Sequence, residues 1–434
     1  MINLKEVMKK QPIVNIGMIG HVSNGKSSVT KCITGIATQK YSDEKKHNIT
    51  IKLGYANCKI YKCPECPEPE CYKSTGLDLD KMVCKDCDVE MELINHLSIC
   101  DVPGHNQFMK AMMNGTNVMD YTILIESVRN TEIPAPQTKE HLLCTTISQI
   151  PNVAICVNKL DLVKKEEAKK YISKLKTELI DTPAENSTVI PISASIGLNI
   201  DALLHVLSEI KPLNKKYDKL ATMFIVRSFN INKCGSKISD LTGGIIGGSI
   251  ISGTLKVDDE VIIKPGYVKK NDSGSRFKYN PIISKVQQIN SEKTKLESAI
   301  SGGLIGVKLD IDPGLTTEDG LIGCILQNKL LDDNSSDEKY KVFEDLELEF
   351  EKFRDFDDIT EINDTVLVNV NSCSCSGKYI KTDDPSKIKI ELIDNPVCVK
   401  IGDYCTISNL YSKDTIRIMG RGKIISGTES LQIE

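Results

Sequence analysis

A glycine-rich loop near the start of the chain limits the possible folds more than any other feature. The apolar run Ile13–Ile19 leads directly into Gly20–Ser27 (GHVSNGKS), and a helical pattern begins at Lys26. Strand, glycine-rich loop and helix in this order form a phosphate-binding loop, because inward-turned N–H groups and the helix N-terminus both attract phosphate. We therefore expect an α/β domain whose parallel sheet binds a nucleotide at the carboxyl ends of its strands.

The residues of this loop have distinct expected roles. Its glycines let the backbone turn N–H groups toward phosphate oxygens. Lys26 is expected to neutralise the β- and γ-phosphates of a nucleotide, and the Ser27 hydroxyl to coordinate Mg²⁺. A chance glycine-rich turn is the alternative, which the flanking strand and helix disfavour. The full set of predicted ligands in this segment is His21, Val22, Ser23, Asn24, Gly25, Lys26, Ser27 and Ser28.

A second motif, the tetrapeptide Asn158–Asp161 (NKLD), follows the apolar run Val153–Val157 and predicts the choice of base. The Asp161 carboxylate can accept hydrogen bonds from N1–H and the exocyclic amine of guanine. Adenine has an acceptor at N1 and no such amine, so it would leave the carboxylate unpaired. Asn158 is expected to support the base or tie its loop to the phosphate loop, and Lys159 to lie over the ring.

One strand later, a short turn completes the expected base contacts. A backbone N–H in such a turn can donate to guanine O6, and the residues are Ser193, Ala194 and Ser195, with Ala194 the expected donor. Taken singly, both base motifs are weak. Their order along the chain, each after a predicted strand, makes a guanine-nucleotide site the joint prediction.

Two segments between these motifs are expected to sense the γ-phosphate. Asp101 follows a predicted strand and is placed to hold Mg²⁺ through water, while the Gly104 N–H is placed to touch the γ-phosphate. His105 is the candidate for orienting the attacking water. Thr50 is the candidate hydroxyl that completes the Mg²⁺ shell when GTP is bound. A surface imidazole after a turn is the alternative for His105.

Two different patterns divide the chain. Up to Pro212, apolar runs alternate with helical stretches at about 26–35, 138–149, 164–179 and 200–210, which predicts a parallel sheet with helices on both faces. After Leu213, short β-rich runs between Gly, Asp and Asn turns predict an antiparallel barrel, and a polar stretch at 331–339 leads into a second one. The expected domains are a GTP-binding domain at 1–217 with an insert at about 58–93, and β-barrels at 218–332 and 333–434.

The insert contains two Cys-x₂-Cys turns, Cys63/Cys66 and Cys84/Cys87, with seventeen residues between them. Two such turns can form a tetrahedral thiolate cage, so the spacing predicts a structural zinc ribbon. A small insert with few apolar residues could hardly become ordered otherwise. Cys71 is a possible substitute for one of the first two ligands, and loss of the metal is the alternative.

Charge and hydropathy exclude several other classes of protein. A formal net charge of −4 argues against a chain that coats nucleic acid non-specifically, although it allows a local basic face for one RNA. The segment Met1–Gln11 has no apolar stretch for a signal peptide, and no run approaches the ~20 apolar residues of a membrane span. We expect a cytoplasmic protein with no membrane partner.

Several segments resemble the gamma subunit of eukaryotic and archaeal translation initiation factor two, a GTPase family related to elongation factor Tu. The match is densest at Asn48–Ala56, Asp101–His105 and Pro136–Leu142, with the cysteine-rich insert between the first two. Weaker matches follow at 227–230, 243–251, 302–307 and 395–398. The resemblance covers nearly the whole chain, strongly to about residue 310 and thinly after 335.

This resemblance implies a GTPase domain followed by two β-barrels, with GTP, GDP, Mg²⁺ and Zn²⁺ as cofactors. It implies a protein that carries methionyl initiator tRNA to the small ribosomal subunit in its GTP form, as the core of a heterotrimer with alpha and beta subunits. GTPase-activating and nucleotide-exchange factors are further implied partners, and hydrolysis should be slow without an activator. Tyr55 lies in a segment that the family uses near the tRNA, although a buried strand aromatic is an equal alternative.

Four residues depart from the family pattern and keep other functions open. Asn24 stands where histidine is usual and Ser28 where threonine is usual, and neither change removes a phosphate ligand. His47 replaces an arginine, and Asn106 an acidic residue. A nucleotide-binding scaffold without hydrolysis is therefore one alternative. An elongation-type factor is another, which the insert and the Ile49–Ala56 segment disfavour, and a metalloenzyme is the least favoured.

Overall fold

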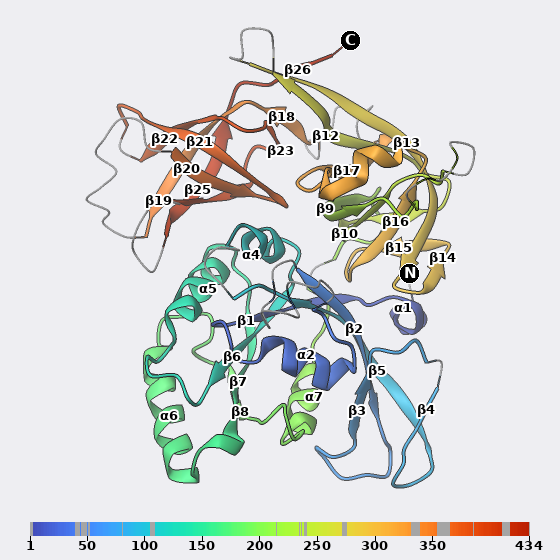
Figure 1. The fold of residues 1–434 in the computed structure, drawn as a ribbon, viewed down its shortest axis with the longest axis vertical. Helices are drawn as coiled ribbons and strands as arrows, with labels where there is room; N and C mark the ends of the chain where they lie inside the picture. Colours follow the sequence, from blue (N-terminus) through green and yellow to red (C-terminus); the bar gives the residue numbers. More distant parts are fainter. Residues whose placement is uncertain are drawn as a thin grey trace. The chain divides into compact units, whose positions relative to one another are not determined.

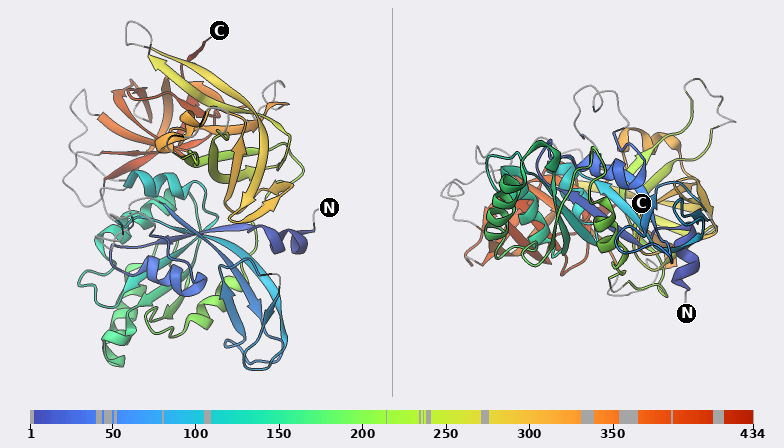
Figure 2. Two further views of the ribbon diagram at one scale, coloured as in Figure 1. Left: turned by 45° about the vertical axis from the view of Figure 1, so that its right-hand side comes forward. Right: turned by 90° about the horizontal axis from the view of Figure 1, so that it is seen from below.

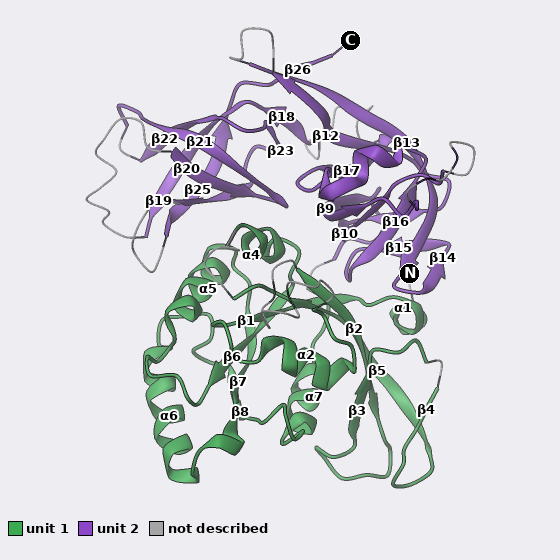
Figure 3. Cartoon of the chain, in the orientation of Figure 1, with its two compact units in different colours: residues 1–214 green, residues 215–434 purple. Residues whose placement is uncertain are grey.

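The chain forms two compact units, residues 1–214 and 215–434 (Figure 3). The computed structural model describes residues 3–433 apart from 40–43, 45–49, 51–52, 80, 105–108, 214, 234, 236, 238–240, 271–275, 331–338, 354–364, 385 and 410–416. Within the described part, no helix is both long enough and apolar enough to cross a membrane.

The first unit is built on a parallel sheet with the strand order β5-β1-β6-β7-β8 (Figure 1). These strands are buried apolar runs, as expected for a sheet covered on both faces. Helices α2 and α7 contact each other, as do α4 and α5, and these pairs cover the two faces. The strands are β1 (Val14–Ile19), β5 (Glu90–Asp101), β6 (Tyr121–Ser127), β7 (Asn152–Asn158) and β8 (Thr188–Pro191).

Among the described residues, four helices follow the predicted stretches, and α1 and α4 lie outside them. Helix α2 begins after Gly25 and ends before Gly35, both in the left-handed region with φ of 96° and 73°, where glycine has no Cβ to strain. The helices are α1 (Leu4–Lys10), α2 (Lys26–Thr34), α4 (Met109–Thr116), α5 (Pro136–Ile147), α6 (Lys165–Glu178) and α7 (Ile200–Ser208), with a short 3₁₀ turn, η2, at Leu160–Leu162.

The cysteine-rich insert extends the sheet rather than standing apart from it. Strand β2 (Gly54–Lys62) pairs antiparallel with β5, and β3 (Tyr72–Thr75) pairs with β2. The short strand β4 (Met82–Val83) pairs with the first residues of β5. The insert thus projects from the β2–β5 end of the sheet (Figures 1 and 2).

The second unit contains two closed six-stranded barrels, which confirms the predicted fold class. In the first, the ring is β12-β17-β9-β10-β16-β13, closed by pairing of β13 with β12. Its core is aliphatic and includes Ile225, Ile246, Val261, Val307 and Leu326. Its elements are β9 (Thr222–Phe229), β10 (Ile245–Ser252), β11 (Thr254–Lys256), β12 (Glu260–Lys270), β13 (Phe277–Ser291), β14 (Thr294–Leu296), β15 (Ser298–Ile300), β16 (Ile305–Leu309), η4 (Pro313–Asp319) and β17 (Ile325–Asn328).

The second barrel is the ring β19-β22-β21-β20-β24-β25. The last strand of the chain, β26, pairs in parallel with β13 of the first barrel, so the C-terminal segment joins both barrels into one unit. The strands are β18 (Lys341–Phe343), β19 (Asp345–Lys352), β20 (Thr365–Val370), β21 (Cys373–Lys381), β22 (Lys387–Leu392), β23 (Val397–Val399), β24 (Tyr404–Ser408), β25 (Ile418–Ser426) and β26 (Leu431–Gln432).

Candidate nucleotide site and metal centre

The loop between β1 and α2 packs so closely against its neighbours that glycine is required at both ends. Gly20 has φ of 134°, and a Cβ there would lie 2.2 Å from the Ile125 carbonyl oxygen. A Cβ on Gly25 would lie 2.4 Å from the Asn158 side-chain nitrogen. The loop is therefore seated between the carboxyl ends of β6 and β7, and the end of β7 begins the motif that was predicted to bind the guanine base.

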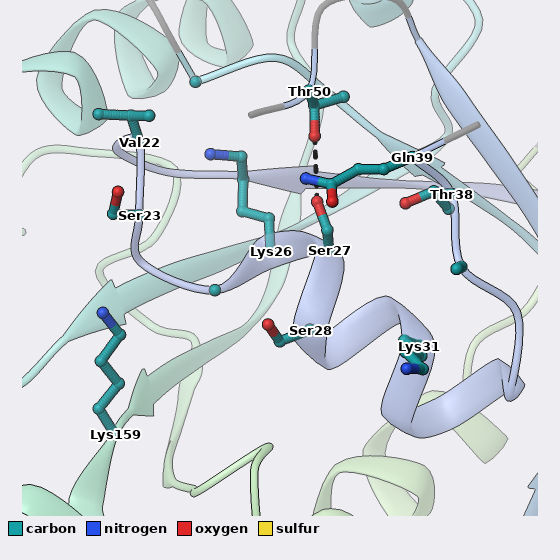
Figure 4. A pocket seen from close by; sticks show the side chains of 13 residues that line it. Val22, Ser23, Lys26, Ser27, Ser28, Lys31, Thr38, Gln39, Thr50 and Lys159 are labelled. Carbon is teal, nitrogen blue, oxygen red and sulfur yellow. Dashed lines mark hydrogen bonds between the residues drawn. The ribbon is translucent and has the colours of Figure 1, made fainter. Parts of the chain in front are cut away.

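A cavity of about 650 Å³ opens in front of this loop (Figure 4). It brings together the loop, the predicted switch residues Thr50 and Gly104, and Lys159 from the base motif, although these segments are far apart in sequence. His21 and Asn24 do not line it. The lining residues are Val22, Ser23, Gly25, Lys26, Ser27, Ser28, Lys31, Ala37, Thr38, Gln39, Thr50, Gly104 and Lys159.

Lys26 is buried beneath the loop, and its ammonium group contacts the loop backbone. The Nζ atom donates to the carbonyl oxygens of Gly20 (2.8 Å) and His21 (2.9 Å). Burial lowers the pKa of Lys26 to about 8, while the nearby Asp101 and Glu126 carboxylates oppose this shift. A positive charge held among carbonyl groups and facing a cavity is suited to a phosphate group.

Four oxygen-bearing side chains converge beside Lys26. The Ser27 and Thr50 hydroxyl oxygens are 3.0 Å apart (Figure 4), and Asp101 Oδ2 accepts from Thr38 at 2.6 Å and Thr50 at 3.5 Å. Asp101 is fully buried, and its Oδ1 atom has no hydrogen-bond partner among the described residues. Burial raises the pKa of this carboxyl, against hydrogen bonds from Ser27 and Thr38. An all-oxygen donor set with an unpartnered carboxylate oxygen fits Mg²⁺.

The residues of the two base motifs lie together at the other end of the loop. Asn158 Nδ2 donates to the Asn24 carbonyl oxygen (2.9 Å), and its Oδ1 accepts from the Ala194 N–H (3.1 Å). Ser193 Oγ donates to Asp161 Oδ1 (2.5 Å) and is 2.9 Å from Ser195 Oγ. The contact of the Ala194 N–H with guanine O6 stays a prediction, since that N–H is bonded to Asn158 in this structure.

The predicted roles of His105 and Tyr55 stay predictions. His105, the predicted water-orienting residue, lies outside the described residues, as do His47 and Asn106. Tyr55 is half-buried in β2, opposite Cys100 of β5, and its role toward tRNA stays a prediction.

Sequence reasoning missed two supporting residues of the pocket. Thr38, which bonds Asp101, follows α2 in a segment without any motif. His141 is buried in α5, and its Nδ1 accepts from the Gly20 N–H at 3.0 Å. Burial lowers the pKa of His141 to about 3, so the ring is neutral at pH 7 and can accept this bond. The resemblance drew attention to the segment Pro136–Leu142, yet nothing local indicated a contact with the loop.

The cysteine pairs of the insert form a second candidate site. The sulfur atoms of Cys63, Cys66, Cys84 and Cys87 all lie within 4.8 Å of one another. Cys71 is buried nearby but is not a member of this group, and its carbonyl oxygen accepts from the Cys63 N–H at 2.9 Å. Four thiols at this spacing match the ligand set of structural zinc.

Comparison with known proteins identifies the class of the chain. The model for the elongation factor Tu GTP-binding domain matches residues 11–212, and that for elongation factor Tu domain 2 matches residues 243–324. With the loop and cavity described above, this defines a GTPase built like elongation factor Tu. Two solved structures share the fold. Bacterial selenocysteine-specific elongation factor EF-Sec is 22% identical with a TM-score of 0.68, over 95% of this chain and 58% of that one. Elongation factor SelB from Methanococcus maripaludis, solved with a GTP analogue, is 20% identical with a TM-score of 0.69, over 96% of this chain and 80% of that one.

Full-length relatives narrow the class to one family. Eukaryotic translation initiation factor 2 subunit gamma of Schizosaccharomyces pombe is 36% identical, over 97% of this chain and 95% of its own length. Translation initiation factor 2 subunit gamma of Methanococcus vannielii is 37% identical, over 96% and 100%. The chain belongs to the family of gamma subunits of translation initiation factor 2.

Proposed function

We propose that this chain binds methionyl initiator tRNA in its GTP form and delivers it to the small ribosomal subunit, as the core of a cytoplasmic heterotrimer with alpha and beta subunits. The observation that carries the proposal is the cavity in which Thr50 and Gly104 meet Lys26 and Ser27. Thr50 and Gly104 belong to different segments, and one phosphate group in the cavity could contact both. A bound γ-phosphate would therefore hold both segments in a single conformation.

The residues around the cavity have separate tasks in this proposal. Ser27, Thr50 and Asp101 hold Mg²⁺, which when bound supplies positive charge to the phosphate oxygens. Lys26 offsets the charge on the β- and γ-phosphates. Residues 158–161 and 193–195 select guanine. Hydrolysis adds water to the γ-phosphorus and breaks its bond to the bridging oxygen, giving GDP and phosphate, with His105 assigned to orient the water.

The initiator-tRNA proposal is tested by binding of labelled methionyl initiator tRNA to the purified chain. We expect tight binding with a non-hydrolysable GTP analogue and much weaker binding with GDP, and elongator methionyl-tRNA is the control. Equal binding in both nucleotide states, or no binding, would contradict the proposed cargo and favour the scaffold alternative. Binding of both tRNAs alike would favour an elongation-type factor.

The role of Gly104 predicts a variant that separates GTP from GDP. A Cβ at this position would lie 2.4 Å from Lys26 Nζ and 2.8 Å from the Val22 nitrogen, so Gly104→Ala must move the switch segment away from the loop. We expect affinity for the GTP analogue to fall roughly tenfold, the loss of about one hydrogen bond to a charged group, with GDP affinity little changed.

Gly306→Ala is the matched control for this experiment. It adds the same methyl group in β16, where, among the described residues, only the Asn290 carbonyl oxygen lies within 4 Å, at 3.9 Å. Fluorescence titration with both nucleotides measures the effect. Equal losses for GDP and the analogue in Gly104→Ala would contradict the assignment of Gly104 to the γ-phosphate.

The cysteine group forms the second part of the proposal, a structural zinc ribbon held by Cys63, Cys66, Cys84 and Cys87. Elemental analysis should find about one zinc ion per chain, and Cys87→Ser should lose most of it because a structural site needs all four ligands. Cys71→Ser, which changes a buried thiol outside the group, should keep the metal. Equal zinc in both variants would contradict this ligand set.

A further inference from the structure

A buried carboxylate next to the phosphate-binding loop has no task in the function described so far. Glu126 lies near the end of β6, and its side chain is fully buried. Its Oε2 atom accepts from Asn130 Nδ2 (2.6 Å) and Tyr171 OH (3.0 Å), and its Oε1 atom accepts from the Thr138 hydroxyl. Burial of a carboxylate is costly unless donors surround it, and here three side chains supply them.

Two of these three donors also contact the phosphate-binding loop. Asn130 Nδ2 donates to Asn24 Oδ1 at 3.1 Å as well as to Glu126. The Thr138 hydroxyl accepts from the His21 N–H at 3.1 Å, and its own proton therefore goes to Glu126. Glu126 is thus connected to the loop at two points, one on each side of Ser23.

The connection continues to the base motif. Asn24 uses its side-chain nitrogen to bond the Ile125 carbonyl oxygen (2.9 Å), and its backbone carbonyl oxygen accepts from Asn158 Nδ2 (2.9 Å). Asn158 in turn accepts from the Ala194 N–H. A continuous set of hydrogen bonds therefore runs from Glu126 through Asn24 to the segments that were predicted to bind guanine.

From this network we infer that Glu126 is a positioning residue for nucleotide binding, which holds the phosphate-binding loop through Thr138 and Asn130. The inference rests on the nucleotide site proposed above. Its physical basis is that the N–H of His21 and the side chain of Asn24 are bonded behind the loop, and neither residue lines the cavity. Because these bonds hold the back of the loop, the N–H groups at its front already point toward the phosphate position before the nucleotide binds. Binding then costs less backbone entropy.

The network also accounts for Asn24, one of the departures from the family pattern. An asparagine side chain has both a donor and an acceptor, and Asn24 uses the donor for Ile125 and the acceptor for Asn130. The side-chain oxygen of Asn24 needs a donor, and Asn130, which also bonds Glu126, supplies it. Asn24, Asn130 and Glu126 therefore form one unit that a change at any member should disturb.

Two substitutions at Thr138 distinguish positioning from simple packing. Thr138 is fully buried, and Thr138→Val keeps its volume but removes the hydroxyl that bonds both His21 and Glu126. Thr138→Ser keeps the hydroxyl but removes the methyl group. We expect fluorescent GDP to bind roughly tenfold more weakly to Thr138→Val and almost normally to Thr138→Ser.

The opposite order of affinities, with Thr138→Ser weaker than Thr138→Val, would show that Thr138 only fills space and would overturn the inference. Melting temperatures of both variants identify any general loss of folding. If the unaltered chain fails to bind GDP, the proposed nucleotide site itself is wrong. If it binds GDP and Thr138→Val binds equally well, only the positioning role is wrong.

A double-mutant cycle tests the second connection. Asn24→Ala and Asn130→Ala should each weaken GDP binding several-fold. The loss in the double variant should be smaller than the sum of the two, because both remove the Asn24–Asn130 bond, while each also removes one bond of its own, to Ile125 and to Glu126. Asn152→Ala is the matched control, since Asn152 is a buried asparagine of β7 that bonds Ala154 and Ser187 instead. Additive losses at positions 24 and 130, or an equal loss in the control, would contradict the network.

Discussion

Replacing Lys26 with alanine should lower the affinity for both GDP and GTP by roughly hundredfold. Lys26 is buried, and its Nζ atom faces the cavity from beneath the loop, where it contacts the Gly20 and His21 carbonyl oxygens. Its removal would leave these carbonyl groups without their donor and the nucleotide phosphates without their buried positive charge. The loss corresponds to about 3 kcal/mol, as expected for charge-assisted hydrogen bonds to phosphate.

Lys31→Ala provides the control for this prediction. Lys31 also lines the cavity, but it is an exposed residue of α2, so its charge is screened by solvent. Isothermal titration with GDP should therefore show a small change for Lys31→Ala and a large one for Lys26→Ala. Comparable GDP affinities in the two variants would contradict the assignment of Lys26 to the phosphate site.

Replacing Asp161 with asparagine should change the preferred base from guanine to xanthine. The asparagine amide would donate where guanine also donates, whereas xanthine has a carbonyl oxygen in place of the exocyclic amine and can accept this bond. The amide oxygen can still accept from Ser193, the contact that Asp161 Oδ1 makes at 2.5 Å, so the local structure should be kept. We expect GTP affinity to fall by roughly hundredfold or more, and xanthosine triphosphate to bind more tightly than GTP.

Competition between the two nucleotides measures this preference directly. Asp201→Asn makes the same chemical change in the first turn of α7, where the carboxylate bonds only its neighbour Ala202 among the contacts described. That control should keep its preference for GTP. An unchanged preference in Asp161→Asn would show that residues 158–161 do not read the base.

Several features of the site could be predicted from short segments of sequence. The loop Gly20–Ser27 has positive φ at Gly20, Ser23 and Gly25, so two of these three positions are glycine, and a strand before the loop and a helix after it are visible as local patterns. The two Cys-x₂-Cys turns were recognised by spacing, and the four thiols lie together as predicted. The two barrels were predicted from β-rich runs between turns, which are likewise local properties.

Other features could not be predicted because they depend on pairing between distant residues. The antiparallel pairing of β2 with β5 places the insert on the edge of the main sheet, and no local pattern shows which strand lies beside which. The same applies to α4 and to the short helix α1, whose seven residues hardly produce a helical period. Pairing of β26 with β13 likewise joins segments from the two barrels.

The sequence by itself determined the class of fold, the phosphate-binding loop, the base motifs and the thiol cluster, because each depends on residues adjacent in the chain. Only the tertiary structure showed that Thr38 bonds Asp101 and that Glu126 is connected to the loop through Thr138 and Asn130. These bonds join side chains from different elements. A buried hydrogen bond between distant segments produces no period and no spacing in the sequence, and it exists only once packing has excluded water from both partners.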